Sequence, residues 1–127
     1  MKTLILLLFS VKACSQDSSK KTQVIDIIGD SITEGLGVES SQAYPQLLQE
    51  RLKKEGKNWT ILNHGISGST SASAISRIKW DLRTPPQIVI LALGANDGLR
   101  GFKPQVTEKN LDEALDLLKK AKVKVIL

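Results

Sequence analysis

The fold is indicated by "VIDIIGDSITEGLG", Val24 to Gly37, in which an aliphatic run stops abruptly at Gly29-Asp30-Ser31. A run of this kind is typical of a buried β-strand. Two further glycines follow within the next six residues, which is more than a plain turn requires. We therefore expect the strand to end at a functional loop, from which the hydroxyl of Ser31 projects at the edge of a sheet as a candidate nucleophile.

Aliphatic runs alternate with segments of helical periodicity along the rest of the chain. The clearest run is "PQIVILALG", Pro86 to Gly94, whose near-continuous Ile, Val and Leu suit a parallel strand buried on both faces. The expected strands lie at 24–28, 59–63, 86–94 and 122–127, and the expected helices at 40–56, 71–82 and 107–121. This alternation predicts an α/β fold, a three-layer sandwich with a parallel sheet and a flavodoxin-like strand order.

The last expected strand, 122–127, reaches the final residue of the sequence. About four strands are then present, with no helix after the last one to cover the sheet. We expect residues 24–127 to be the N-terminal portion of a C-terminally incomplete domain. Such a domain would expose a strand edge and apolar surface, which predicts poor solubility.

The composition is that of an ordinary globular domain and disfavours nucleic-acid binding. The 127 residues are 41% hydrophobic and 24% charged, and only 4% are aromatic, too few for a base-stacking platform. The net charge of +5 falls to +3 when Lys2 and Lys12 of the N-terminal segment are set aside. No basic block remains, so no nucleic-acid partner is expected.

Residues 1–13 are expected to be a signal peptide. Lys2 gives a positive start, and "TLILLLFSV" is an apolar core too short to span a bilayer. The following "VKAC", Val11 to Cys14, resembles a bacterial lipoprotein processing site, although a lysine at its second position is atypical. The alternative is an ordinary secretory peptide followed by an unpaired cysteine.

Cys14 is the only cysteine, so no internal disulfide can form. Its position favours lipidation, and two or more acyl chains would anchor the protein stably to a membrane. Residues 14–23 would then be a polar tether. On this interpretation the protein is exported, and the lipid anchor holds it at the periplasmic side of a bacterial membrane.

Three motifs of small residues follow three successive expected strands: "GDS" at 29–31, "GISGST" at 65–70 and "GAND" at 94–97. Because the carboxyl ends of parallel strands meet at one edge of a sheet, we expect these motifs to lie together. A serine, the backbone N–H of Gly68 and the side-chain amide of Asn96 would there provide a nucleophile and two hydrogen-bond donors. Acyl transfer needs such donors for the oxygen that becomes negative.

Each motif also has a purely structural interpretation. Ser31 or Thr33 could cap a helix, Gly68 could occupy a left-handed turn, and Asn96 could bond to local backbone. These alternatives are favoured for each motif taken alone. The convergence of all three motifs at one edge is what favours a functional site.

Two ligand classes are disfavoured. A glycine-containing loop between a strand and a helix could bind a phosphate or nucleotide, but "GDSITEGLG" lacks the lysine of a P-loop and the glycine spacing of a dinucleotide site. Asp30 and Glu34 would also repel an anion. The sequence shows no cluster of His, Cys and carboxylate residues, so no metal or organic cofactor is expected.

The ordered motifs Gly29-Asp30-Ser31, Gly68 and Gly94–Asp97 resemble those of the GDSL esterases, also called SGNH hydrolases. The resemblance covers Val24 to Leu127. The run "GANDGLRGFKPQVTEKNL" is especially similar to the branch of periplasmic acyl-CoA thioesterase I, lysophospholipase and arylesterase. It implies a flavodoxin-like serine ester hydrolase that acts on small-molecule or lipid esters and thioesters.

Carried over by position, the resemblance implies an acyl intermediate on Ser31. The backbone N–H of Ser31, the N–H of Gly68 and the amide of Asn96 would form the oxyanion hole. Asp30 and Asp97 occupy motif positions of the family, and we interpret them as structural supports of the loops at the site.

One family motif is missing from these residues. An Asp-x-x-His near the C-terminus supplies the general base and the group that orients it. The only histidine here is His64, which we expect to pack or hydrogen-bond at the pocket rim rather than to act as the base. Without a base Ser31 is a weak nucleophile, so the chain as given is expected to be nearly inactive. The alternative is a non-catalytic lipoprotein that binds an acyl chain or a sugar.

Overall fold

The computed structural model describes residues 22–127, so the expected signal peptide, Cys14 and most of the expected tether lie outside the described residues. The four strands of the described chain form one parallel sheet in the order β2-β1-β3-β4. They are β1 (Gln23–Gly29), β2 (Trp59–Gly65), β3 (Ile88–Ala92) and β4 (Lys124–Ile126). The predicted parallel α/β sheet is confirmed, and β1 begins one residue earlier than expected.

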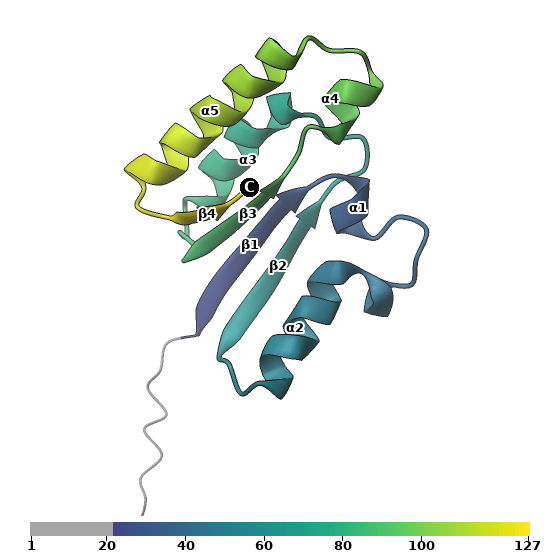
Figure 1. Cartoon of the computed structure of the whole chain (residues 1–127). Coiled ribbons are helices and arrows are strands. Elements are labelled where there is room, and N and C mark those ends of the chain that lie inside the picture. Colours follow the sequence, from purple (N-terminus) through teal and green to yellow (C-terminus); the bar gives the residue numbers. More distant parts are fainter. Residues whose placement is uncertain (1–21) are drawn as a thin grey trace, which may run out of the picture.

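Helices cover both faces of the sheet, which gives the three layers predicted from the sequence (Figure 1). Helix α2 (Tyr44–Lys54) packs on β2, and α3 (Ala74–Asp81) and α5 (Pro104–Lys120) pack against each other on the opposite face. Both α2 and α5 begin with a proline in the first turn and end with lysines. Proline fits the first turn because its missing N–H has no partner there, and lysine complements the negative end of the helix dipole.

The main core lies between the sheet and the pair α3 and α5. Alternate strand residues point to this side, and residues four apart on each helix meet them. The buried members are Ile28, Val89 and Leu91 from the strands, Ala74 and Ile78 from α3, and Ala114 and Leu118 from α5. Small alanines on both helices allow them to approach the sheet closely.

Two short helices were not predicted. Helix α1 (Ser31–Glu34) follows β1, and α4 (Ala95–Leu99) follows β3, where the sequence analysis expected loops. Each is shorter than two turns, so neither has a hydrophobic period to reveal it. Both begin at the carboxyl edge of the sheet, and they carry the first and third small-residue motifs.

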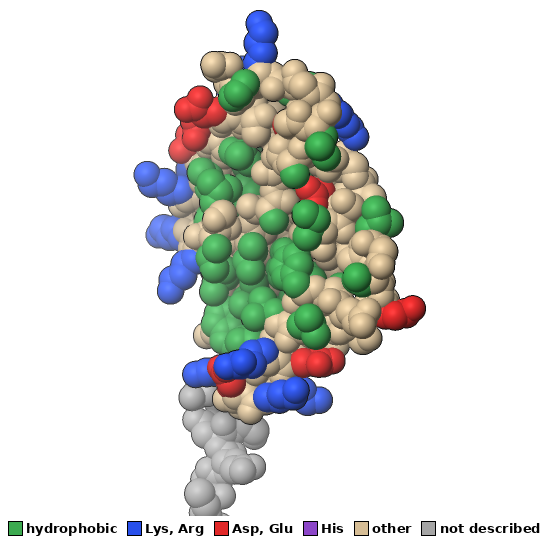
Figure 2. Space-filling view, turned by 45° about the vertical axis from the view of Figure 1, so that its right-hand side comes forward, with side chains coloured by type: hydrophobic (Ala, Val, Ile, Leu, Met, Phe, Trp, Pro, Cys, Tyr) green, Lys and Arg blue, Asp and Glu red, His purple; other side chains and the backbone are tan. Residues whose placement is uncertain are grey.

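Part of the apolar surface remains exposed, as the sequence predicted. Among the described residues β4 is an edge strand, and the side chains of Ile126 and Leu127 are 54% and 71% exposed. Figure 2 shows hydrophobic side chains gathered in the middle of one face of the molecule. No helix of residues 22–127 is both long enough and apolar enough to cross a membrane.

Candidate active site

The three small-residue motifs meet at the carboxyl edge of the sheet. Gly29 at the end of β1 pairs in register with Gly65 of β2 on one side and with Ala92 of β3 on the other. The N–H of Ile66 donates to the carbonyl oxygen of Gly29 at 3.1 Å, which continues the pairing beyond β2. The structure therefore confirms that the motifs converge, and it places Ser31, Gly68 and Asn96 in the segments that leave this edge.

Ser31 is the first residue of α1, and its hydroxyl makes no hydrogen bond to any described residue. The helix is capped instead by the buried Asp30, whose carboxylate accepts from the N–H of Ile32 at 3.0 Å. Thr33 is buried, and its hydroxyl is 2.9 Å from that of Tyr44. The capping alternative for Ser31 or Thr33 is therefore wrong, and the half-buried Ser31 hydroxyl has no structural partner.

Glycines in the strand ends allow α1 to lie directly on the backbone. A Cβ at Gly65 would come within 2.1 Å of the backbone nitrogen of Glu34, and one at Gly29 within 1.9 Å of the Thr33 hydroxyl oxygen. No larger residue fits at either position without moving the helix. The small residues around Ser31 are thus needed for the close packing that fixes its position.

The loop that carries Gly68 is fastened to α1. Ser67 donates from its backbone N–H to the Glu34 carboxylate at 2.7 Å and also from its hydroxyl. Gly68 has a φ of +76°, the left-handed conformation expected there, and its carbonyl accepts from Arg100 at 2.8 Å. No described residue accepts a hydrogen bond from the N–H of Gly68 or of Ser31. Both donors remain available to a ligand.

Asn96, in α4, reaches the same loop from the third strand. Its Nδ2 donates to the carbonyl oxygen of Ser69 at 2.9 Å, next to Gly68. An amide nitrogen carries two hydrogens, so one donor remains available. Arg77 joins the first two motifs, since its Nη1 donates to the Gly29 carbonyl at 3.0 Å and to the Ser69 hydroxyl at 3.3 Å.

Asp97 holds α4 in place through hydrogen bonds from Ser71 and Thr107. Its buried carboxylate accepts from the N–H and hydroxyl of Ser71, at 2.8 and 2.5 Å, and from the hydroxyl of Thr107 at 3.2 Å. Burial would raise the pKa of Asp97, but the hydrogen bonds from Ser71 and Thr107 outweigh it and leave that pKa below its ordinary value. The carboxylate is therefore held charged, and it joins α4 to the chain on either side.

A cavity of about 310 Å³ lies beside α1 at this edge. It is bordered by Asp30 and Ile32, the two neighbours of Ser31 in the chain, and by Tyr44. The rest of its lining is mostly apolar: Leu91, Leu93, Leu111 and Leu127 contribute to it. Ser31, Gly68 and Asn96 do not line this space, whose size and polarity suit a small hydrocarbon group.

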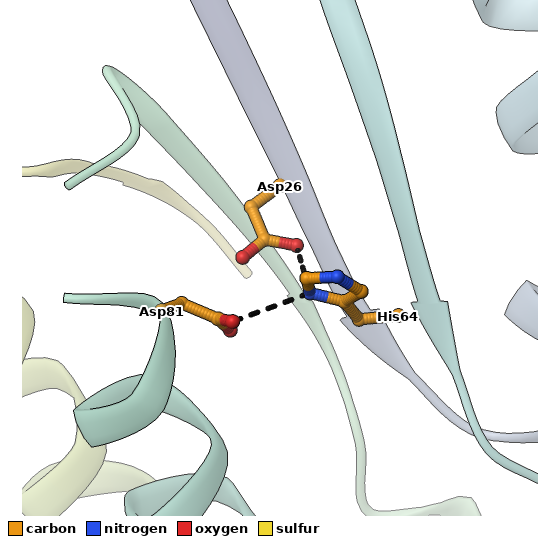
Figure 3. Close-up of side chains that lie close together, drawn as sticks. All are labelled: Asp26, His64 and Asp81. Atoms are coloured by element: carbon orange, nitrogen blue, oxygen red, sulfur yellow. Dashed lines mark ion pairs between the residues drawn. The ribbon is translucent and has the colours of Figure 1, made fainter. Parts of the chain in front are cut away.

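His64 lies elsewhere. It projects from β2 on the α3 side of the sheet, where its Nδ1 is 2.9 Å from Oδ1 of Asp26 and 3.4 Å from Oδ1 of Asp81 (Figure 3). It borders two cavities of about 500 and 410 Å³ together with Trp80 and Asp81, and neither includes Ser31. His64 is thus at the rim of a pocket, but not of the one beside Ser31.

The expectation that no His and carboxylate cluster exists was wrong. Asp26, His64 and Asp81 are far apart in the sequence, and the parallel pairing of β1 with β2 and the packing of α3 bring them together. Burial raises the pKa of Asp26 to about 8, and the neighbouring carboxyl of Asp81 raises it further, whereas Arg77 opposes the rise. One signal of this cluster was present in the sequence. Asp26 lies two residues before Ile28 in β1, so the alternation of the strand places its charge on the side that faces the core.

The sequence model of the GDSL-like Lipase/Acylhydrolase family matches residues 27–127. The chain belongs to this family. The match includes all three small-residue motifs, and it agrees with the fold.

Two family members and one solved structure show the extent of the likeness. An arylesterase of Vibrio mimicus is 35% identical over 124 residues, 97% of this chain and 60% of that protein. The thioesterase 1/protease 1/lysophospholipase L1 of Escherichia coli is 34% identical over 125 residues, 98% of this chain and 56% of that protein. The crystal structure of AlinE4, an SGNH-hydrolase family esterase, matches with a TM-score of 0.77 at 37% identity and covers 85% of this chain and 59% of its own.

The chain thus spans about 60% of the length of these relatives. The matched part holds the Gly29–Ser31 motif, the Gly68 loop and the Asn96 helix. The family's Asp-x-x-His motif is not among the 127 residues.

Proposed function

We propose that this protein is a serine ester hydrolase that acts through an acyl-Ser31 intermediate. The observation that carries the proposal is that the Ser31 hydroxyl makes no hydrogen bond to any described residue. It lies at the edge of the sheet where three hydrogen-bond donors remain available, namely the N–H of Ser31, the N–H of Gly68 and the Asn96 amide. Membership of the GDSL-like family supports the same conclusion.

In the proposed reaction the Ser31 Oγ attacks the carbonyl carbon of an ester or thioester. The carbonyl oxygen becomes negative in the tetrahedral intermediate and accepts hydrogen bonds from the N–H of Ser31, the N–H of Gly68 and the Asn96 amide. Collapse of the intermediate releases the alcohol or thiol and leaves the acyl group on Ser31, and water then releases the acid. Each such donor contributes about 3 kcal/mol to stabilising the transition state.

The attack also requires removal of the Ser31 proton. The resemblance assigns this task to the histidine of the Asp-x-x-His motif, and His64 is turned toward Asp26 and Asp81 instead. The activity is therefore proposed for a chain that carries this motif in addition to residues 22–127, which the structure describes. A chain restricted to the 127 residues should turn over esters only very slowly.

We propose acyl esters and thioesters of small or lipid-like alcohols as substrates. The apolar cavity beside Ser31 supports a hydrocarbon acyl group. The similar proteins are an arylesterase and a thioesterase that is also a lysophospholipase. Their names support both esters and thioesters as substrates.

We also propose that the protein is exported and held at the periplasmic side of a membrane by lipid on Cys14. The support is the charged start, the short apolar core and the "VKAC" sequence. Labelled palmitate should enter the protein in a bacterial host and should not enter a Cys14→Ser variant. Equal incorporation by both proteins would contradict the anchor.

The catalytic proposal is tested by following p-nitrophenol release from p-nitrophenyl butyrate with the full-length protein. We expect Ser31→Ala to lower the rate by about three orders of magnitude or more, as for removal of a catalytic serine elsewhere. Ser41→Ala, which alters an exposed serine on the turn before α2, should leave the rate unchanged. Equal rates for the two variants would contradict the assignment of Ser31.

A further inference from the structure

We propose that Asp26, His64 and Asp81 form a binding site for one divalent transition-metal ion, for which Zn²⁺ is the best match. The site lies between β1, β2 and the C-terminal end of α3, on the face of the sheet away from α2 (Figure 3). It is separate from the proposed ester site and does not depend on it.

The first argument is the state of the Asp26 carboxylate. Its side chain is 1% exposed, yet neither oxygen accepts a hydrogen bond within the described chain. Oδ2 of Asp81 is buried without a partner as well. A buried carboxylate without hydrogen bonds is strongly unfavourable, so such groups take up a proton, pair with a cation or coordinate a metal.

The second argument is the geometry of the three donor atoms. One oxygen of each aspartate and one nitrogen of His64 all lie within 4.8 Å of one another. Ligand atoms about 2.0–2.2 Å from a tetrahedral Zn²⁺ are roughly 3.3 Å apart, close to the 2.9 and 3.4 Å observed between Nδ1 and the two carboxylates. The three atoms can therefore surround one ion after small side-chain adjustments.

A proton on His64 is the rival occupant. An imidazolium would donate a straight hydrogen bond to Asp26, and at 2.9 Å the distance is suitable. However, Oδ1 of Asp26 has no hydrogen-bond partner in the described structure. Without a proton between them, the nitrogen and the oxygen can both ligate one ion.

The charges of the side chains around the site also favour a cation. Asp26 and Asp81 carry two negative charges when ionised, and the nearby Arg77 supplies one positive charge. The Nη1 of Arg77 is engaged by Gly29 and Ser69, and its buried Nη2 has no hydrogen-bond partner in the described structure, so the arginine makes no hydrogen bond to either aspartate. When a bound metal ion displaces the proton of Asp26, the two carboxylates and Arg77 leave one net negative charge for the ion to balance.

The site is open to an ion from solution. His64 is 42% exposed, and a cavity of about 500 Å³ is bordered by all three residues. One imidazole and two carboxylates suit Zn²⁺, whose fourth position would hold a water on the cavity side. Mg²⁺ prefers six oxygen ligands and is a poor match.

Metal binding would join β1 and β2 to the end of α3. An ion that binds the folded chain and not the unfolded chain stabilises the fold by mass action. We therefore expect the bound ion to hold β1, β2 and the end of α3 together and to stabilise the folded chain.

The test is a calorimetric titration of the metal-stripped protein with Zn²⁺, followed by the thermal midpoint with and without the ion. We expect one equivalent to bind, and we expect His64→Ala and Asp81→Asn each to weaken binding about 100-fold. Asp116→Asn, an exposed carboxylate on α5, is the matched control and should bind as the unaltered protein does. Mg²⁺ should not raise the midpoint.

Replacement of the ion by Co²⁺ gives a readout that needs no variant. Tetrahedral Co²⁺ with nitrogen and oxygen ligands should produce strong visible absorption when added to the unaltered protein, and excess Zn²⁺ should remove it. Absence of both absorption and saturable Zn²⁺ binding would overturn the proposal. Undiminished binding by a folded His64→Ala variant, judged by circular dichroism, would overturn it too.

Discussion

Asp26 and Asp97 are both 1% exposed, and their surroundings differ in every other respect. Asp97 accepts three hydrogen bonds from Ser71 and Thr107, and its pKa lies below the ordinary value. Asp26 accepts none, faces the carboxyl of Asp81, and has its pKa raised to about 8. Burial alone therefore does not decide the charge of a carboxyl group, because the available donors do.

The contrast follows from where each residue lies. Asp97 is at the start of a helix beside loops rich in hydroxyl and N–H donors, so a charged carboxylate fits there. Asp26 is in the middle of a strand, where the backbone N–H groups are used by the sheet. Asp97 therefore stabilises the proposed ester site, whereas Asp26 requires a proton or a cation.

The largest expected effect is that of removing the satisfied carboxylate. Asp97→Ala leaves the N–H and hydroxyl of Ser71 buried without an acceptor, at a cost of about 3–4 kcal/mol in the free energy of unfolding. Urea denaturation measures the change. Asp112→Ala, which removes an exposed carboxylate of α5, should change the stability by less than about 0.5 kcal/mol. Similar losses of unfolding free energy in the two variants would contradict the stabilising role of the hydrogen bonds to Asp97.

A smaller effect is expected from pH, through Asp26. The pKa of Asp26 is about 8 in the folded protein and about 4 in the unfolded chain. Between about pH 4 and pH 8 the folded protein therefore keeps a proton on Asp26 that the unfolded chain has lost. This contribution to stability is fully present below about pH 4 and is lost as the pH rises through about 8.

With metal removed by EDTA, the protein should therefore lose about 2 kcal/mol relative to Asp26→Asn between about pH 6 and pH 8. Urea denaturation at the two pH values measures the difference, and Asp116→Asn serves as the control because its carboxylate is exposed. A constant difference between the protein and Asp26→Asn would show that Asp26 stays ionised in the folded state.

The smallest effect is expected from one partner of Asp97. Thr107→Val removes the hydroxyl that donates at 3.2 Å, and it should cost about 1 kcal/mol. Because the folded pKa of Asp97 is lowered, its contribution is present above the ordinary value and lost on acidification. The variant should unfold at a higher pH during acid titration than Thr84→Val, which alters an exposed threonine. Identical acid midpoints would contradict the role of Thr107.

Sequence patterns predicted the sheet and the meeting of the three motifs because both depend on local periodicity and on the geometry of parallel strands. The long apolar run before Gly94 and the period of α5 were sufficient for this. Helices α1 and α4 were missed since their positions depend on close packing against Gly29, Gly65 and the Asp97 network rather than on a pattern. The Asp26 cluster was missed because strand register and the end of α3 create it.

The roles of Ser31, Gly68 and Asn96 as nucleophile and oxyanion donors remain predictions. The most direct measurement is mass-spectrometric mapping of the full-length protein after reaction with a fluorophosphonate, which modifies activated serines. The account predicts one adduct per chain, on the peptide that contains Ser31, and its loss in Ser31→Ala but not in Ser41→Ala. An adduct spread over several serines, or none on Ser31 in folded protein, would contradict it.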